Sequence, residues 1–270
     1  MNLTDKELNP DEHIICSTCG TQYKTHKQEI CFICSDERQY IPEQGQAWTT
    51  HQQLLQKHNV EVLKLQDNLF QFTVSPAIGI GQRALLLLSP EGNILWDCIP
   101  LLDDIVTEFI RSKGGLKAIA FSHPHFFSNM SQWADKFDCP VYINAKDKNW
   151  IFNKGNHITL WEGEQKHLWD DICITNLGGH FPGSSILHAR QSSPGGMILS
   201  GDTVLVSADK KHISIMYSYP NRIPLPIKDA NRIMSKLKTL EFDSLYSAFP
   251  NLGITKNVKE ILSASIARYI

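Results

Sequence analysis

Two paired-cysteine motifs near the N-terminus constrain the fold of this chain more than any other feature. Cys16-Ser17-Thr18-Cys19 and Cys31-Phe32-Ile33-Cys34 are separated by eleven residues. Each C-x-x-C turn lets two thiolates converge on one ion, and two such turns complete a tetrahedral set with no open position. Residues 1–46 are too short and polar for a hydrophobic core, so metal binding would supply their folding energy. We therefore predict a zinc-ribbon-like segment with structural Zn²⁺ on Cys16, Cys19, Cys31 and Cys34.

Disulfides and unrelated free thiols are the alternatives for these cysteines. Residues 1–6 are polar and lack the apolar core of a secretory signal, and no apolar run approaches the roughly 20 residues that span a bilayer. We therefore expect a reducing cytoplasmic location, in which disulfides are rare. Cys98, Cys139 and Cys173 lie in apolar strand contexts, and we expect them to be inert core residues.

The rest of the chain, residues 47–270, has the composition of one globular domain. The whole sequence of 270 residues is 42% hydrophobic and 20% charged, with a net charge of -2. Without a cluster of Lys and Arg, neither nucleic acid nor a membrane is an expected partner. A small-molecule substrate is the expected partner, and residues 1–46 leave room for a homodimer contact or a protein partner.

Short apolar runs separated by turn residues predict the strands of this domain. Four consecutive strands come first, at 60–65, 69–74, 83–88 and 93–97. Later strands alternate with helices, and we expect them at 117–121, 141–144, 158–161, 172–177, 185–188 and 197–199. Helical stripes are formed by Ile105, Phe109 and Ile110, by residues 130–137, by residues 230–240, and by Val258, Ile261, Leu262, Ile266 and Tyr269. Hairpins followed by alternating elements predict an α+β fold with two packed sheets and helices outside.

Three predicted strands end at residues that can bind a metal ion. His123 and His125 follow the strand at 117–121, and two histidines at i and i+2 on an extended loop can chelate one ion. His180 lies in a glycine-rich turn after the strand at 172–177, and Asp202 follows the strand at 197–199. Three imidazoles and a carboxylate suit a borderline metal, so we predict one Zn²⁺ or Fe²⁺ on His123, His125, His180 and Asp202.

These motifs resemble those of the metallo-β-lactamase superfamily, over about residues 60–270. The family pattern is H-x-H-x-D-H, then G-G-H-T-P-G-S, then G-D and a final histidine; here Gly178–Ser184 and Ser200–Thr203 carry the two middle motifs. The resemblance implies an αββα sandwich with metals at one edge between the sheets, and it makes Asp97 the structural aspartate that ends a strand. It is closer to a bacterial branch of metallo-hydrolases in which a C-x-x-C pair precedes the domain and residues like Met216–Asn221 follow the G-D motif.

The departures from the family pattern all concern the second metal. Phe127 and Ser128 stand where the family has an aspartate and a histidine, and no histidine follows His212, although the final one should fall near residues 248–250. The resemblance therefore implies that at most one ion binds, held by the first-metal ligands and by the carboxylate that bridges the two metals in dinuclear members. These residues are His123, His125, His180 and Asp202.

Three functions are compatible with this set of residues. We favour a one-metal hydrolase of a small ester-like or thioester-like molecule, in which Asp202 is the base and the three histidines hold the ion. His123, His180 and Asp202 could instead bind non-haem iron, as in the persulfide dioxygenases of the superfamily. A non-catalytic, metal-stabilised binding module is the third possibility. Tyr217 and Tyr219 follow Asp202 and either line a substrate cleft or pack the core.

Overall fold

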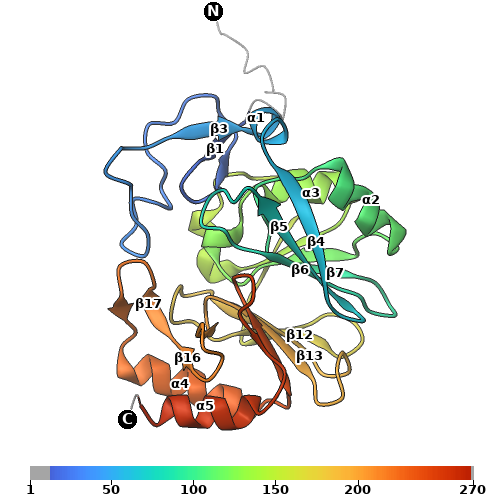
Figure 1. Ribbon diagram of the computed structural model, residues 1–270, viewed down its shortest axis with the longest axis vertical. Coiled ribbons are helices and arrows are strands. Elements are labelled where there is room, and N and C mark those ends of the chain that lie inside the picture. Colours follow the sequence, from blue (N-terminus) through green and yellow to red (C-terminus); the bar gives the residue numbers. More distant parts are fainter. Residues whose placement is uncertain (1–12, 269–270) are drawn as a thin grey trace, which may run out of the picture.

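Two β-sheets packed face to face form the centre of the main domain, in a computed structural model that describes residues 13–268 (Figure 1). Helices α2 (Asp104–Ser112) and α3 (Met130–Phe137) cover the outer face of the first sheet. Helices α4 (Ile227–Lys238) and α5 (Val258–Ile266) cover the outer face of the second sheet. This arrangement of four layers is the predicted αββα sandwich, which is confirmed.

The first sheet has seven strands, and the four that come first along the chain form the hairpins expected from the sequence. In spatial order they are β10 (Ile158–Trp161), β9 (Val141–Asn144), β8 (Ala118–Ala120), β7 (Ile94–Trp96), β6 (Ala84–Leu87), β5 (Leu69–Ser75) and β4 (Asn59–Gln66). The pairs from β4 to β7 are antiparallel, and the pairs from β7 to β10 are parallel.

The second sheet has six strands, of which three have no counterpart in the sequence-based prediction. Its order is β11 (Gln165–His167), β12 (Ile172–Asn176), β13 (Ser185–Ala189), β14 (Met197–Gly201), β19 (Ser244–Ser247) and β20 (Gly253–Ile254). Only the pair of β14 and β19 is parallel. The strands that were not predicted are β11, β19 and β20, which are short.

The alternation of side chains along each strand divides the interior into separate apolar layers. Leu85 and Leu87 of β6 face the second sheet, where Leu187 and Leu199 meet them. Leu86, between them in sequence, faces α2 and α3 instead. Both faces of the first sheet are therefore buried at β6, which accounts for its continuous apolar run.

Helix α2 shows one error in the sequence-based prediction. Asp103 caps it, since one carboxylate oxygen accepts from Val106 N at 2.9 Å and the other accepts from Val60 N of β4 at 2.7 Å. Val106 and Ile110, which are four residues apart and share one face of the helix, are buried, whereas Ile105 is 58% exposed. The prediction that Ile105 lies on the buried face was wrong.

The N-terminal segment forms a small sheet of its own above the sandwich (Figure 1). Strand β1 (Ile14–Cys16) lies between β2 (Gln22–Tyr23) and β3 (Trp48–Thr50), and α1 (His51–Leu55) follows directly. Contrary to the sequence-based expectation, the segment has a small apolar core. It contains the four cysteines with Ile14, Tyr23 and Ile33, and main-domain residues Ile80, Trp150 and Phe152 pack against it.

Two short helices and two ribbons complete the described chain. These are η2 (Pro124–Phe126), η3 (Ala145–Trp150), the ribbon of β15 (Leu205–Val206) and β16 (Ile213–Ser214), and the ribbon of β17 (Met216–Ser218) and β18 (Ile223–Pro224). Within residues 13–268, no helix has the length and apolar character needed to cross a bilayer. Tyr269 and residues 1–12 of the predicted N-terminal segment lie outside the described residues.

Candidate metal sites

The four cysteines of the paired motifs converge at one point, which we call the four-cysteine site. Cys16 Sγ lies 3.7 Å from Cys34 Sγ, and Cys19 Sγ lies 3.5 Å from Cys31 Sγ. Tetrahedral coordination at a Zn–S distance of about 2.3 Å places sulfurs about 3.8 Å apart. All four thiols are buried and free of disulfide bonds. The geometry therefore fits the predicted metal site and excludes disulfides.

Hydrogen-bond donors around the sulfurs favour thiolates. Gln46 Nε2 donates to Cys16 Sγ at 3.1 Å, and the Tyr23 hydroxyl donates to Cys31 Sγ at 3.3 Å. Donors of this kind orient the side chains that hold a metal ion and tune them for metal binding. The other cysteine thiols also donate to Cys16, which lowers the pKa of its thiol. The remaining three cysteines, Cys98, Cys139 and Cys173, are buried apart from this site, as expected.

The second cluster lies where three strands of the sandwich end. β8 leads into His123 and His125, β12 leads into the turn that carries His180, and β14 ends at Gly201, directly before Asp202. Gly201 has a positive φ of 55°, and a Cβ there would overlap Ser122 Oγ, so the backbone comes this close only with glycine.

The four predicted side chains meet in what we call the histidine–aspartate site. Each offers one ligand atom, and these atoms lie within 4.8 Å of one another. His180 Nε2 is 3.3 Å from His125 Nδ1, and His123 Nε2 is 3.7 Å from Asp202 Oδ2. The three histidines are each 1% exposed and Asp202 is 4% exposed. The structure therefore brings together the whole set that the sequence indicated.

Neighbouring groups determine which ring nitrogen of two histidines faces the centre. His180 Nδ1 donates to the Tyr217 carbonyl at 2.7 Å, which leaves Nε2 as the ligand atom. His123 Nδ1 is 2.8 Å from Ser122 Oγ, which also lies 2.9 Å from both carboxylate oxygens of Asp97. Links of this kind from a carboxylate or carbonyl to an imidazole fix the tautomer of a metal ligand.

The polar atoms at the centre lack other partners. At the centre, His123 Nε2 and Asp202 Oδ1 are buried without a hydrogen bond from any part of the chain that the structure describes. An orphaned buried polar atom is costly, so a cluster of them indicates a ligand that the protein chain does not supply. A metal ion with its bound water fits the three nitrogens and the carboxylate.

Burial shifts the pKa values of these four side chains in the direction that favours their uncharged forms. It lowers the pKa of His180 to about 4, and it lowers the pKa of His123 and His125 well below the ordinary range, with neighbouring histidines adding to the effect. Burial also raises the pKa of Asp202 to about 7. Neutral imidazoles are the form that binds metal, so near neutral pH no proton must leave the histidines first.

The positions that carry second-metal ligands in the family have structural roles here. Phe127 is 4% exposed and packs edge-on against Phe121 at 5.1 Å in the core beneath the helices. Ser128 joins the domain to the N-terminal segment, since its hydroxyl donates to the Gly20 carbonyl at 3.0 Å and its carbonyl accepts from Gln22 N at 3.2 Å. Neither residue is directed at a metal ion.

Around the site, Arg38 and Ser122 were missed by the sequence analysis, which left Tyr219 open between lining a cleft and packing the core. Arg38 of the N-terminal segment donates to the His180 carbonyl at 2.7 Å. The Tyr219 hydroxyl donates to the Asp202 carbonyl at 2.9 Å, so this residue supports the site. Ser122 could have been suspected from its place next to His123, but nothing in the sequence around Arg38 distinguishes it from a surface arginine.

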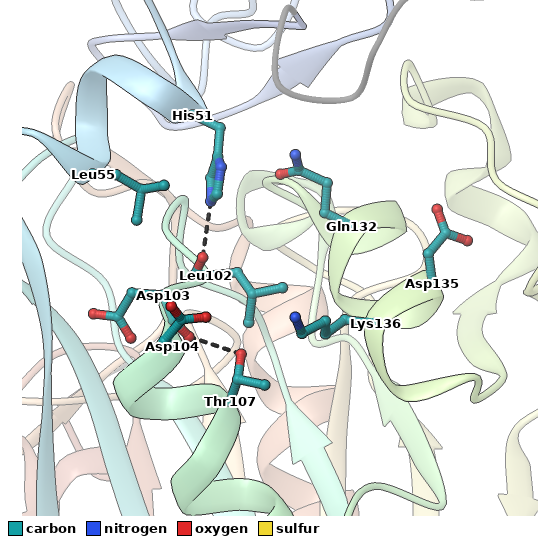
Figure 2. Close-up of a pocket in the computed structure, with 9 residues that line it drawn as sticks. All are labelled: His51, Leu55, Leu102, Asp103, Asp104, Thr107, Gln132, Asp135 and Lys136. Carbon is teal, nitrogen blue, oxygen red and sulfur yellow. Dashed lines mark hydrogen bonds between the residues drawn. The ribbon is translucent and has the colours of Figure 1, made fainter.

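A hollow of about 470 Å³ lies away from both metal sites, between α1, α2 and α3 (Figure 2). Its polar groups are used by the fold itself: His51 Nε2 lies 2.9 Å from the Leu102 carbonyl, and Thr107 Oγ1 donates to the Asp103 carbonyl at 2.7 Å. The clusters of three or more metal-binding side chains within residues 13–268 are the two sites described above, and neither is in this hollow.

Known proteins resemble this chain in sequence and in fold. No protein-family model matches it. The protein of Bacillus subtilis (strain 168) described as uncharacterized protein YmaE is 40% identical over 266 residues, which cover 96% of both chains. The DIM-1 metallo-β-lactamase has a TM-score of 0.60 at 16% identity, over 79% of this chain and 98% of its own. FIM-1 from Pseudomonas aeruginosa in its mono-zinc form has a TM-score of 0.57 at 12% identity, over 78% and 94%. These likenesses confirm the predicted metallo-β-lactamase fold.

Proposed function

Since this chain belongs to the same protein family as YmaE and has the metallo-β-lactamase fold, we propose that it is a metal-dependent hydrolase with one catalytic metal ion. Zn²⁺ is the ion proposed for both sites. The substrate proposed is a small ester-like or thioester-like molecule. One observation carries the proposal: three imidazole nitrogens and a carboxylate oxygen converge within 4.8 Å, at the edge between the sheets.

The residues of the histidine–aspartate site suit this chemistry. A divalent ion held there would supply Lewis acidity, which lowers the pKa of water and polarises a carbonyl. Neutral histidines hold such an ion without cancelling its charge. Asp202 Oδ1 has no partner among the described residues, so it can accept a hydrogen bond from water, orient it toward the substrate and take its proton.

The residues that stand at the family's second-metal positions support a single ion. Phe127 cannot coordinate a metal, and the segment near the expected final histidine consists of Ala248, Phe249 and Pro250. Phe249 instead lies 6.5 Å, between ring centroids, from Phe126. The structure of FIM-1 in a mono-zinc form shows that a metallo-β-lactamase fold can be obtained with one zinc ion.

The burial of the site favours a second candidate function, a non-catalytic binding module. Because each of the four side chains is at most 4% exposed, a substrate can reach them only when the covering residues move. Arg38 is part of this cover. The iron oxygenase alternative has less support, because His125 joins the same cluster and leaves fewer open positions than two histidines and a carboxylate would.

Hydrolysis by the wild type and an Asp202→Asn variant tests the proposal. The panel should contain esters, thioesters, lactones and phosphodiesters, with metal content measured on the same samples. We expect turnover of an ester or thioester, reduced about 100-fold or more in the variant, since a positioned general base contributes about 10²–10⁴. Bound metal without any turnover would support the binding module, and oxygen uptake by an iron-loaded sample would support the oxygenase.

A further inference from the structure

We propose that Arg38 is a positioning residue for the metal ligand His180, through which the N-terminal segment sets the metal affinity of the histidine–aspartate site. The inference rests on the proposed metal occupancy of that site and not on turnover. It assigns a role to the loop that follows the second C-x-x-C motif. In Figure 1 this loop, in blue, approaches the orange ribbon of β17.

The Arg38 side chain contacts the backbone and the neighbour of His180. Its Nε donates to the His180 carbonyl at 2.7 Å. Its guanidinium carbon lies 4.3 Å from the ring centroid of Phe181, the next residue, and 4.5 Å from that of Tyr217. The planar guanidinium thus contacts both rings while Nε donates to the His180 carbonyl. A lysine cannot reproduce this combination of contacts.

Tyr217 connects this contact to the orientation of the imidazole. The Tyr217 carbonyl accepts the hydrogen bond from His180 Nδ1 that leaves Nε2 free for the metal. Arg38 therefore touches the main chain of the ligand and also the residue that orients its ring. Losing Arg38 would release both constraints on His180, the one ligand that the glycine-rich turn supplies.

Arg38 is itself fixed by the geometry of the four-cysteine segment. Asp36, two residues after Cys34, accepts from Arg38 N at 3.0 Å and from Nη1 at 2.7 Å. The Ser218 hydroxyl donates to the Arg38 carbonyl at 3.0 Å. Asn221 Nδ2 donates to the carbonyls on both sides of Arg38, each at 2.9 Å. The loop is thus held between the four-cysteine site and the ribbon of β17 and β18.

The positive charge of Arg38 should weaken metal binding, whereas its positioning contacts should strengthen it. It contributes to the lowered pKa of all three histidines, so it would also repel a metal cation. The Asp36 carboxylate, paired at 2.7 Å, offsets this charge, and both side chains are largely buried at 13% and 16% exposure. The net charge presented to the site is therefore small, and the positioning contacts should dominate.

Cobalt binding to the full chain tests the inference. Co²⁺ on thiolates gives charge-transfer absorption that a site of nitrogen and oxygen ligands lacks, so the two sites can be titrated separately against a chelator. We expect Arg38→Ala and Arg38→Lys each to weaken binding at the histidine–aspartate site about 10–100-fold, the usual cost of losing a group that orients a metal ligand. The thiolate absorption should be unchanged in both, which shows that the segment is folded.

Arg111→Ala is the matched control, because this arginine is half exposed and, among residues 13–268, its side chain pairs with Glu108. It should bind cobalt as the wild type does. Equal or tighter binding in Arg38→Ala would overturn the inference and show that charge repulsion dominates. An affinity in Arg38→Lys equal to the wild type would also overturn it. A positive charge without the planar guanidinium would then be sufficient for metal affinity. Failure of the wild type to bind cobalt at the histidine–aspartate site would overturn the proposed function as well.

Discussion

At the scale of single residues, Ser122 joins a buried carboxylate to a metal-binding imidazole. Its hydroxyl lies 2.9 Å from both oxygens of Asp97 and 2.8 Å from His123 Nδ1. Replacing Ser122 with Ala should weaken metal binding at the histidine–aspartate site about 10–100-fold, because His123 loses the group that orients its ring. Ser131→Ala is the control, since this buried hydroxyl donates to the Asn153 carbonyl at 2.8 Å instead. Equal affinities of the two variants would refute the role of Ser122.

Asp202 should determine how metal affinity depends on pH. Its pKa is raised to about 7 by burial, so below pH 7 a metal ion must displace a proton from it. The pKa of His180 is lowered to about 4, so this histidine requires no such exchange above about pH 5. Between pH 7 and 5, the affinity of the wild type should fall up to tenfold per pH unit.

The Asp202→Asn variant should bind more weakly but with little dependence on pH over that range. Competition with a chelator of known protonation behaviour, at several pH values, measures both. The same slope in the two proteins would show that another group takes up the proton.

The sequence indicated which side chains converge in the histidine–aspartate site, because strand ends and glycines marked them. His123, His180 and Asp202 each follow a buried strand, and the ends of strands in packed sheets meet at one edge. Arg38 had no such signal. Its contact with the His180 carbonyl joins residues 142 positions apart. Such a contact forms only when the N-terminal segment docks on the main domain, and local sequence patterns do not contain that information.

At the scale of elements, α2 offers a direct test of which face is buried. Ile110 is fully buried, whereas Ile105 is 58% exposed. Ile110→Ala should lower the free energy of unfolding by about 2–5 kcal/mol, the range for large-to-small core substitutions. Ile105→Ala should lower it by less than about 1 kcal/mol. Urea unfolding of both variants measures this difference, and similar losses would contradict the burial of the face that carries Ile110.

The four-cysteine segment should depend on its metal for order. We expect Cys31→Ser to lose one metal ion per chain and to speed amide hydrogen exchange in residues 13–41, since ligand binding supplies folding energy to such segments. Cys173→Ser should keep both metal ions, because Cys173 is buried outside both clusters. Unchanged exchange in Cys31→Ser would show that the aromatic core around Tyr23 suffices.

Long, regular elements were predictable and the short ones were not. The strands at 141–144 and 158–161 have the predicted bounds, because apolar runs between turn signals define them. The two-residue strands β15, β16, β18 and β20 are too short to show a period. Ile105 was misplaced because it lies five residues from Ile110, on another face of the helix, whereas Val106 lies four residues from Ile110 and shares its face.

At the scale of the whole molecule, two metal sites are joined through one chain of contacts. The four-cysteine segment sits over the sandwich, and Ser128 connects them at a position where the family has a metal ligand. The position at which the family's second-metal ligand is replaced and the docking of the N-terminal segment thus involve the same residue. This is the physical reason to expect one ion, and not two, between the sheets.

The metal content of the purified chain tests this account most directly. Mass spectrometry of protein prepared without chelators should give two metal ions per chain: one at the four-cysteine site and one at the histidine–aspartate site. A His123→Ala/His180→Ala double variant and the Cys31→Ser variant should each retain one. Three ions in the wild type, or a content that the double variant leaves unchanged, would contradict the account.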